Sequence, residues 1–241
     1  MQETIRSPAI VLLEVILPHI LTNDPTTLTD RNENVKEGLC EFYGCYRRQE
    51  TFVRCMLLDT VIPEENVSAS HLFRRSNENQ SSVMMQISNI DDVRNGLLQF
   101  KPLKHVFDYF LISFILDNMD DLGLKLFDAS IRDTRLIDLT DRNGNKVLTD
   151  KQTKIFLGSI SSRNKKKRCH FNEQKTFGDV DGRTLAFTGL ERPFYRCLNL
   201  QARLARVLAL MTFPDFWSEV SLDDKMELFN RCIIETDDEM F

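Results

Sequence analysis

The sequence predicts an α+β protein, because strand-like and helix-like patterns occupy different parts of the chain. Short apolar runs that favour strands gather between residues 52 and 115. The segment before them favours helices, and the segment after them favours hairpins followed by helices. Of the 241 residues, 42% are hydrophobic and 17 are Phe. A largely disordered chain is therefore excluded, because this much apolar surface supports a packed core.

Three segments are expected: an N-terminal helical segment at residues 1–50, a compact core at 51–120, and a C-terminal extension at 121–241 whose hairpin and helices pack on the core. In the first segment, an apolar run at 9–17 and the stretch 35–46 are typical of helices. The apolar run contains an acidic residue and lacks a small-residue cleavage site. We interpret it as a buried helix rather than a signal peptide.

No part of the sequence approaches the roughly 18 uncharged apolar residues that a membrane span requires. We therefore expect an intracellular protein, in the cytoplasm or nucleus, with no membrane partner. The six Cys residues have no close framework and are expected to be reduced thiols. The oligomeric state stays open at this point.

The core segment begins with two predicted strands, at 52–58 and 66–73. The polar stretch that follows, at 74–82, favours an exposed loop. Asn95-Gly96 then predicts a tight turn before a strand at 97–100. These elements together predict a hairpin in the middle of the core segment.

A short helix and several later elements complete the expected fold. Pro102 suits the first turn of a helix at 103–109, because its fixed φ fits there and its missing N–H is not needed. The apolar run at 110–115 favours a further strand. The later elements are a hairpin around Asn143-Gly144 (136–139 with 146–148), another at Asp181-Gly182 before 184–187, and helices at 198–211 and 223–234.

Three side chains of the core segment have types that suit phosphodiester hydrolysis. His71 ends a predicted strand, Asn95 opens a turn, and His105 lies on a short helix with Asp108 three residues later on the same face. The reaction needs a base for water, positive charge at the phosphate, and a group that orients them. An imidazole can act as the base. A divalent ion held by His or carboxylate can supply the positive charge, and a side-chain amide can orient the base.

The same positions lie in three motifs that resemble those of HNH endonucleases. The motifs are Ser68-Ala69-Ser70-His71-Leu72, Arg94-Asn95-Gly96-Leu97-Leu98 and Leu103-Lys104-His105-Val106-Phe107-Asp108. Any one of them is a weak signal, but the three in this order on suitable elements are fairly specific. The resemblance covers about residues 52 to 116. It implies a ββα-metal fold, in which a hairpin and a helix hold one divalent ion.

The resemblance also implies a role for each residue. His71 would be the general base, Asn95 would hold the hairpin and orient that base, and His105 would be a metal ligand. Asp108 would be a second ligand or an acid acting on His105. The implied activity is metal-dependent hydrolysis of nucleic acid, with DNA as the expected partner. Mg²⁺ is the expected ion, and Mn²⁺ or Zn²⁺ are the alternatives.

Two positions depart from the family's pattern. Ser70 precedes the predicted base, where well-studied HNH enzymes commonly have an Asp or His that binds the metal. Phe110 stands where this subgroup often has Gly. The first departure bears on metal affinity, because a serine hydroxyl is a poor ligand. The second bears on the turn after the helix.

The net charge of the whole chain, −5, argues against binding to nucleic acid, because phosphate contacts require local positive charge. Basic residues nevertheless flank the motifs. The predicted phosphate contacts are Arg74, Arg75, Lys101 and Lys104.

Two other functions are compatible with the sequence. One is a catalytically degenerate HNH-fold module that binds nucleic acid or a protein without cleavage. The other is a structural or interaction protein in which Cys40, Cys45 and Cys55 hold zinc, although no C-x-x-C pair is present.

Overall fold

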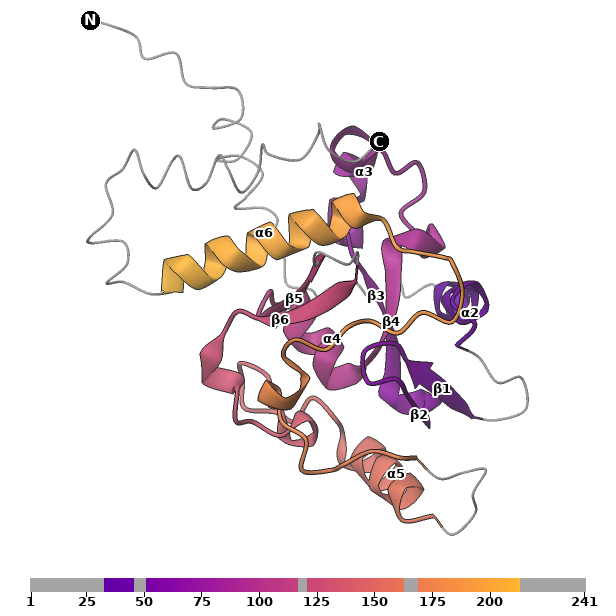
Figure 1. The fold of residues 1–241 in the computed structure, drawn as a ribbon, viewed down its shortest axis with the longest axis vertical. Coiled ribbons are helices and arrows are strands. Elements are labelled where there is room, and N and C mark those ends of the chain that lie inside the picture. Colours follow the sequence, from indigo (N-terminus) through magenta and orange to yellow (C-terminus); the bar gives the residue numbers. More distant parts are fainter. Residues whose placement is uncertain (1–32, 46–50, 117–120, 163–168, 213–241) are drawn as a thin grey trace, which may run out of the picture.

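A computed structural model describes residues 33–45, 51–116, 121–162 and 169–212. It confirms the α+β class, with α-helices around small two-stranded antiparallel sheets (Figure 1). The predicted helices at 9–17 and 223–234 lie outside the described residues. No described helix combines the length and the apolar character that crossing a membrane requires.

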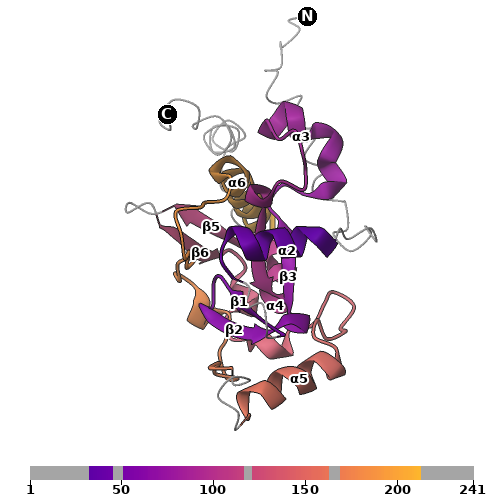
Figure 2. The ribbon, with the colours of Figure 1, turned by 90° about the vertical axis from the view of Figure 1, so that its right-hand side faces the viewer.

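The predicted helix at 35–46 is present as α2 (Glu33–Phe42). It packs on strands β3 (Val67–His71) and β4 (Gly96–Phe100), and Figure 2 shows it crossing in front of β3. Gly96 permits this contact, because a Cβ at that position would lie 3.0 Å from the methyl carbons of Leu39. Its φ of −146° is ordinary extended backbone. A tight turn does precede β4, as predicted, because a 3-10 helix (Val93–Asn95) ends there and the backbone N–H of Gly96 bonds to the carbonyl of Val93. The close approach of α2, rather than the turn itself, explains the glycine.

The strand predicted at 52–58 is shorter and forms a hairpin of its own. β1 (Phe52–Cys55) pairs antiparallel with β2 (Thr60–Pro63). The chain reverses at Asp59, which adopts a left-handed φ of 50° and forms an ion pair with Arg54. The apolar residues after Cys55 are buried in the turn, which explains why they resemble a continuing strand.

The predicted central hairpin and helix are present. β3 (Val67–His71) pairs antiparallel with β4 (Gly96–Phe100), and His71 stands opposite Gly96. α4 (Lys101–Asp108) begins directly after β4 and packs against both strands. Pro102 lies in its first turn, as predicted. This unit is the ββα core that the sequence predicts.

The connection between β3 and β4 is folded, and the prediction of an exposed loop at 74–82 was wrong. A 3-10 helix (Arg75–Asn77) leads into α3 (Glu78–Met85). Met85, Ile87 and Ile90 anchor the end of this connection in the core. The polar residues at 74–82 suggested a loop because the buried apolar residues that hold this connection in place come only after them.

The strands at the start of the C-terminal extension pair differently from the prediction. β5 (Ile112–Leu116), which was predicted, pairs antiparallel with β6 (Leu122–Leu126), which was not. The segment after Gly182 lies against β6 through a bridge between Gly123 and Thr184, instead of forming a separate hairpin. Gly182 has a positive φ of 80° in the turn that precedes this pairing.

The hairpin predicted around Asn143-Gly144 is reduced to a tight loop. A 3-10 helix (Leu136–Asp138) replaces its first strand, and a single bridge joins Thr140 to Lys146. The next helix, α5 (Asp150–Ile160), was not predicted. It begins at a capping box formed by Thr149 and Gln152.

One buried cluster links the N-terminal helix, the ββα core and the extension. Phe156 of α5 stacks on Phe100 of β4 with ring centroids 5.0 Å apart. α6 (Tyr195–Thr212), which contains the predicted helix at 198–211, packs on β5. Gln201 of α6 donates a hydrogen bond of 2.8 Å to the carbonyl of Phe107. The extension therefore supports the helix that carries His105.

Candidate active site

His71 is the last residue of β3, and its imidazole faces a carboxylate from the folded connection. Nε2 of His71 lies 3.1 Å from Oδ1 of Asp91, and the guanidinium of Arg75 pairs with the other oxygen of Asp91. An ion-paired carboxylate only accepts hydrogen bonds, so Nε2 carries the proton of a neutral His71. The lone pair of Nδ1 is then available to accept a proton.

The surroundings of His71 favour its neutral form. Burial lowers the pKa of His71, and the positive charges of Arg75 and Lys104 act in the same direction. The hydrogen bond and the charge of Asp91 oppose this shift, without reversing it. An imidazole with a lowered pKa is uncharged near neutral pH, as a general base must be.

Asn95 is fully buried and uses its side-chain amide to hold the backbone around the end of β3. Nδ2 donates to the carbonyls of Phe73 and Ile90 at 3.1 and 2.9 Å. Oδ1 accepts the backbone N–H of Phe73 at 2.8 Å. The amide therefore joins the residues that follow His71 to the segment that carries Asp91.

His105 and Asp108 lie on the same face of α4, but their contacts differ. The ring of His105 lies 4.7 Å from the ring of Tyr109, and burial lowers the pKa of His105. Within the described ranges, no hydrogen bond or ion pair involves the ring nitrogens of His105. Its imidazole is therefore available to a ligand.

The carboxylate of Asp108 is engaged at both oxygens. The hydroxyl of Ser70 donates to Oδ1 at 3.2 Å, and the ammonium of Lys104 pairs with Oδ2. The guanidinium of Arg74 donates to the backbone carbonyl of Asp108. Ser70, which replaces the expected ligand, thus ties the end of β3 to the C-terminal end of α4. A metal role for Asp108 requires Lys104 to move.

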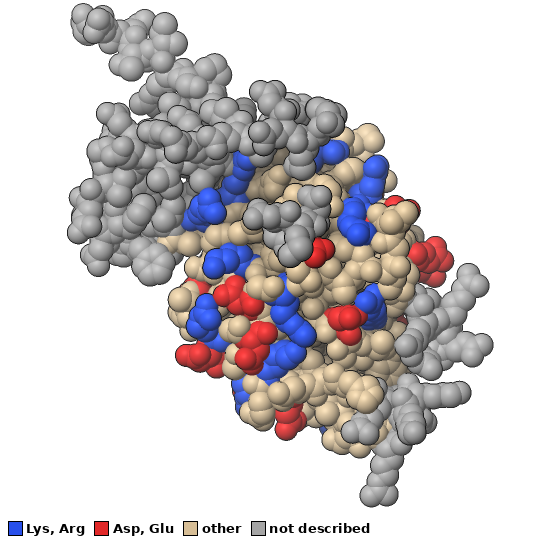
Figure 3. Space-filling view, viewed as in Figure 1, with Lys and Arg blue, Asp and Glu red and all other residues tan. Residues whose placement is uncertain are grey.

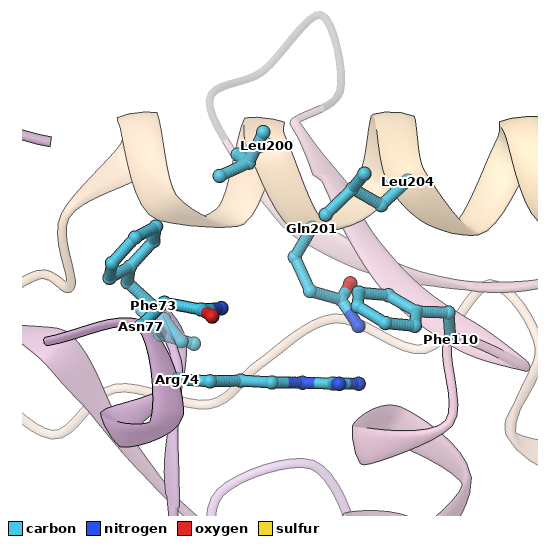
Figure 4. A pocket seen from close by; sticks show the side chains of 8 residues that line it. Phe73, Arg74, Asn77, Phe110, Leu200, Gln201 and Leu204 are labelled. Atoms are coloured by element: carbon cyan, nitrogen blue, oxygen red, sulfur yellow. The ribbon is translucent and has the colours of Figure 1, made fainter. Parts of the chain in front are cut away.

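The four predicted phosphate contacts all interact with other parts of the protein. Arg75 pairs with Asp91 and Lys104 with Asp108. Arg74 lies 4.1 Å below the ring of Phe110, beside a small pocket under α6 (Figure 4). The fourth, Lys101, is half-buried at the start of α4. Acidic and basic side chains of the described residues are interspersed on the face drawn in Figure 3.

The residues of the site fit a sparsely held divalent ion. In the part of the chain that the structure describes, no three His, Cys, Asp or Glu side chains form a metal-binding group. His105 is available, however, and Asp108 and Asp141 both act electrostatically on its pKa. An ion such as Mg²⁺ keeps several waters and is usually held by one or two carboxylates together with substrate phosphate, whereas an imidazole also suits Zn²⁺.

The described cysteines give no support to the alternative of a zinc site. Sγ of Cys55 accepts the backbone N–H of Phe100 at 3.3 Å. Burial raises the pKa of Cys40 to about 12 and that of Cys45 to about 11. Burial therefore keeps these thiols protonated in the metal-free protein, and no three His, Cys, Asp or Glu side chains of the described residues form a group that could hold a metal ion.

Sequence reasoning missed two residues of this region. Asp91 stands four positions before Asn95. A carboxylate so close to the second motif was the feature of the sequence that could have indicated a partner for His71. Arg142 lies well beyond the motifs, and its guanidinium stacks on Tyr109 with 4.6 Å to the ring centroid. Nothing in the local sequence indicates this contact.

Comparison with known families agrees with the arrangement of these elements. Residues 55–115 match the family model HNH_2, which describes an HNH endonuclease. The matched segment runs from the end of β1 into β5 and contains all three motifs. No curated protein and no solved structure matches the chain.

Proposed function

We propose that this chain, which carries an HNH endonuclease segment at residues 55–115, hydrolyses phosphodiester bonds of nucleic acid in a metal-dependent reaction. DNA is the proposed substrate. The observation that carries the proposal is the contact of 3.1 Å between His71 and Asp91 at the end of β3, next to the helix with His105. An imidazole oriented by a carboxylate on β3 suits a general base, and an available imidazole on the helix that packs against this strand suits a metal ligand.

His71 is the proposed general base. Its Nδ1 takes a proton from the attacking water, while Nε2 keeps its hydrogen bond to Asp91. The imidazolium that forms is stabilised by the negative charge of Asp91. Asp91 is therefore proposed as the residue that sets the tautomer and direction of the base, and Asn95 as the residue that holds the backbone of both.

His105 is the proposed protein ligand of the ion, with Asp108 as a second ligand if Lys104 releases it. A divalent ion bound there supplies positive charge against the phosphate and the leaving oxygen. Mg²⁺ is proposed, with Mn²⁺ and Zn²⁺ as alternatives. Ser70 acts indirectly, because its hydroxyl fixes Asp108 relative to β3.

A plasmid-nicking assay with Mg²⁺, Mn²⁺, Zn²⁺ or EDTA tests this proposal. We expect nicking with at least one of these ions and none in EDTA. His105→Ala should raise the metal concentration needed for half-maximal nicking by at least about tenfold, because a ligand is lost. His170→Ala is the matched control, since His170 is an exposed histidine outside the motifs and should change nothing. Nicking that persists in EDTA, or a His105→Ala variant with wild-type metal dependence, would contradict the proposal.

The alternative function, a degenerate module that binds nucleic acid or a protein without cleavage, has one observation in its favour. The carboxylate of Asp108 is already engaged by Ser70 and Lys104, which leaves His105 as the available ligand on α4. A wild-type protein that retards DNA yet cuts none with any ion would establish this alternative.

Asp91→Asn should lower the maximal cleavage rate by about tenfold, because the amide no longer fixes the tautomer of His71. Asp91 raises the pKa of His71, so its loss should lower that pKa further. Because the base works when neutral, the acidic limb of the pH–rate profile should then move to lower pH. The measurement is that profile for the wild type and the variant.

Asp92→Asn provides the control for this prediction. Asp92 is the neighbouring carboxylate, but it caps a 3-10 helix and pairs with Arg94. Its replacement should leave the acidic limb in place. An Asp91→Asn profile identical to that of the wild type would remove Asp91 from the proposed mechanism.

A further inference from the structure

The loop at residues 140–146 is held in one tight shape by its own hydrogen bonds. Oδ1 of Asp141 accepts the backbone N–H groups of Asn143 and Asn145, each at 2.8 Å. These bonds lower the pKa of Asp141 and keep it ionised. Gly144 has a φ of 80°, which closes the turn without strain. Arg142, which lies between Asp141 and Asn143, is therefore held by a preformed loop.

This loop lies against the face of α4 that carries the proposed metal ligand. The guanidinium of Arg142 is 4.6 Å from the ring centroid of Tyr109, and the same ring lies 4.7 Å from that of His105. Asp141 raises the pKa of His105 and Arg142 lowers it, so both charges lie within electrostatic reach of that imidazole. A segment outside the family match thus borders the proposed site.

The guanidinium of Arg142 keeps its hydrogen-bonding capacity. It has five N–H donors, and none of them bonds to a residue that the structure describes. Its Cζ atom lies over the ring of Tyr109, and a cation–π contact of this kind uses up no hydrogen-bond donor. By contrast, Arg75 and Lys104 form ion pairs with Asp91 and Asp108 within the protein. Arg142 is therefore a positioned cation that is ready to bind an anion.

We infer that Arg142, presented by the loop at 140–146, binds a backbone phosphate of the nucleic-acid substrate beside His105. This inference rests on the proposed nuclease function. The planar fork of a guanidinium matches two phosphate oxygens, and such charge-assisted pairs are among the stronger hydrogen bonds. Tyr109 is the positioning residue, because its ring holds the guanidinium next to the imidazole.

The inference is tested by the binding of a short fluorescent DNA duplex, measured at several salt concentrations in the non-cutting His71→Ala background. Adding Arg142→Ala should weaken binding about tenfold, the effect of losing one charge-assisted bond. It should also reduce the slope of log affinity against log salt by about 0.9, which is the value for one phosphate contact. Arg142→Lys should keep that slope and lose part of the affinity, since it retains the charge without the fork.

Lys146→Ala is the matched control, because it removes one positive charge from the same exposed loop. Lys146 lies 3.8 Å from Asp150, and its loss should change the salt slope much less than that of Arg142. An Arg142→Ala variant with unchanged affinity and slope would overturn the inference, while nicking by the wild type would leave the nuclease function standing. A wild type that neither binds nor cuts DNA would remove both.

Discussion

Replacing His71 with alanine should lower the rate of metal-dependent cleavage by about 10³-fold, within the range that a general base contributes. The loss should lie in the chemical step, because the proposed role of His71, whose imidazole contacts Asp91, is to take a proton from water and not to bind the phosphate backbone. DNA affinity should therefore stay close to that of the wild type. The measurement is single-turnover cleavage with saturating metal, accompanied by a binding titration in EDTA.

The control for His71→Ala is His170→Ala, which removes an exposed imidazole elsewhere in the described chain. It should cut at the wild-type rate. A His71→Ala protein that cuts as fast as the wild type would indicate a contaminating nuclease and would leave the site without support. Loss of DNA binding together with cleavage would instead assign His71 to substrate binding.

Replacing Asn95 with alanine should lower the free energy of unfolding by about 4 kcal/mol, because several buried polar groups would lose their partners. The carbonyls of Phe73 and Ile90 and the N–H of Phe73 all bond to this one side chain. Asn95 is fully buried, so water cannot replace these bonds without opening the segment. The measurement is urea unfolding of the full chain, followed by circular dichroism.

Asn143→Ala is the matched control for stability, since Asn143 is exposed in the loop at 140–146. Its replacement should change the free energy of unfolding by less than about 0.5 kcal/mol, as is usual for surface positions. A loss below about 1 kcal/mol for Asn95→Ala would contradict the proposed holding role, because a single unsatisfied buried group already costs that much.

The sequence by itself determined the order of the motifs and the local structure that carries them. Short runs that favour strands predicted β3 and β4, and Pro102 marked the first turn of α4. The spacing of three residues put His105 and Asp108 on one helix face. These features depend on residues close together in the chain, so local patterns were enough to predict them.

Only the tertiary structure decided what each of these residues touches. The pairing of Asp91 with His71 spans 20 positions, and it depends on how α3 and the residues after it fold. Gly96 looked like a turn residue, but the approach of Leu39 explains it. The stacking of Arg142 on Tyr109 joins the extension to the core.

The physical reason is that such contacts form when distant segments pack together. A polar stretch such as 74–82 favours a loop when it is read alone, yet it folds because Met85 and Ile87 beyond it are buried. Likewise, Asp108 has a side chain suited to metal binding, but Ser70 and Lys104 already hold it. Residue type and spacing therefore predict which groups can react, whereas packing decides which of them are free to do so.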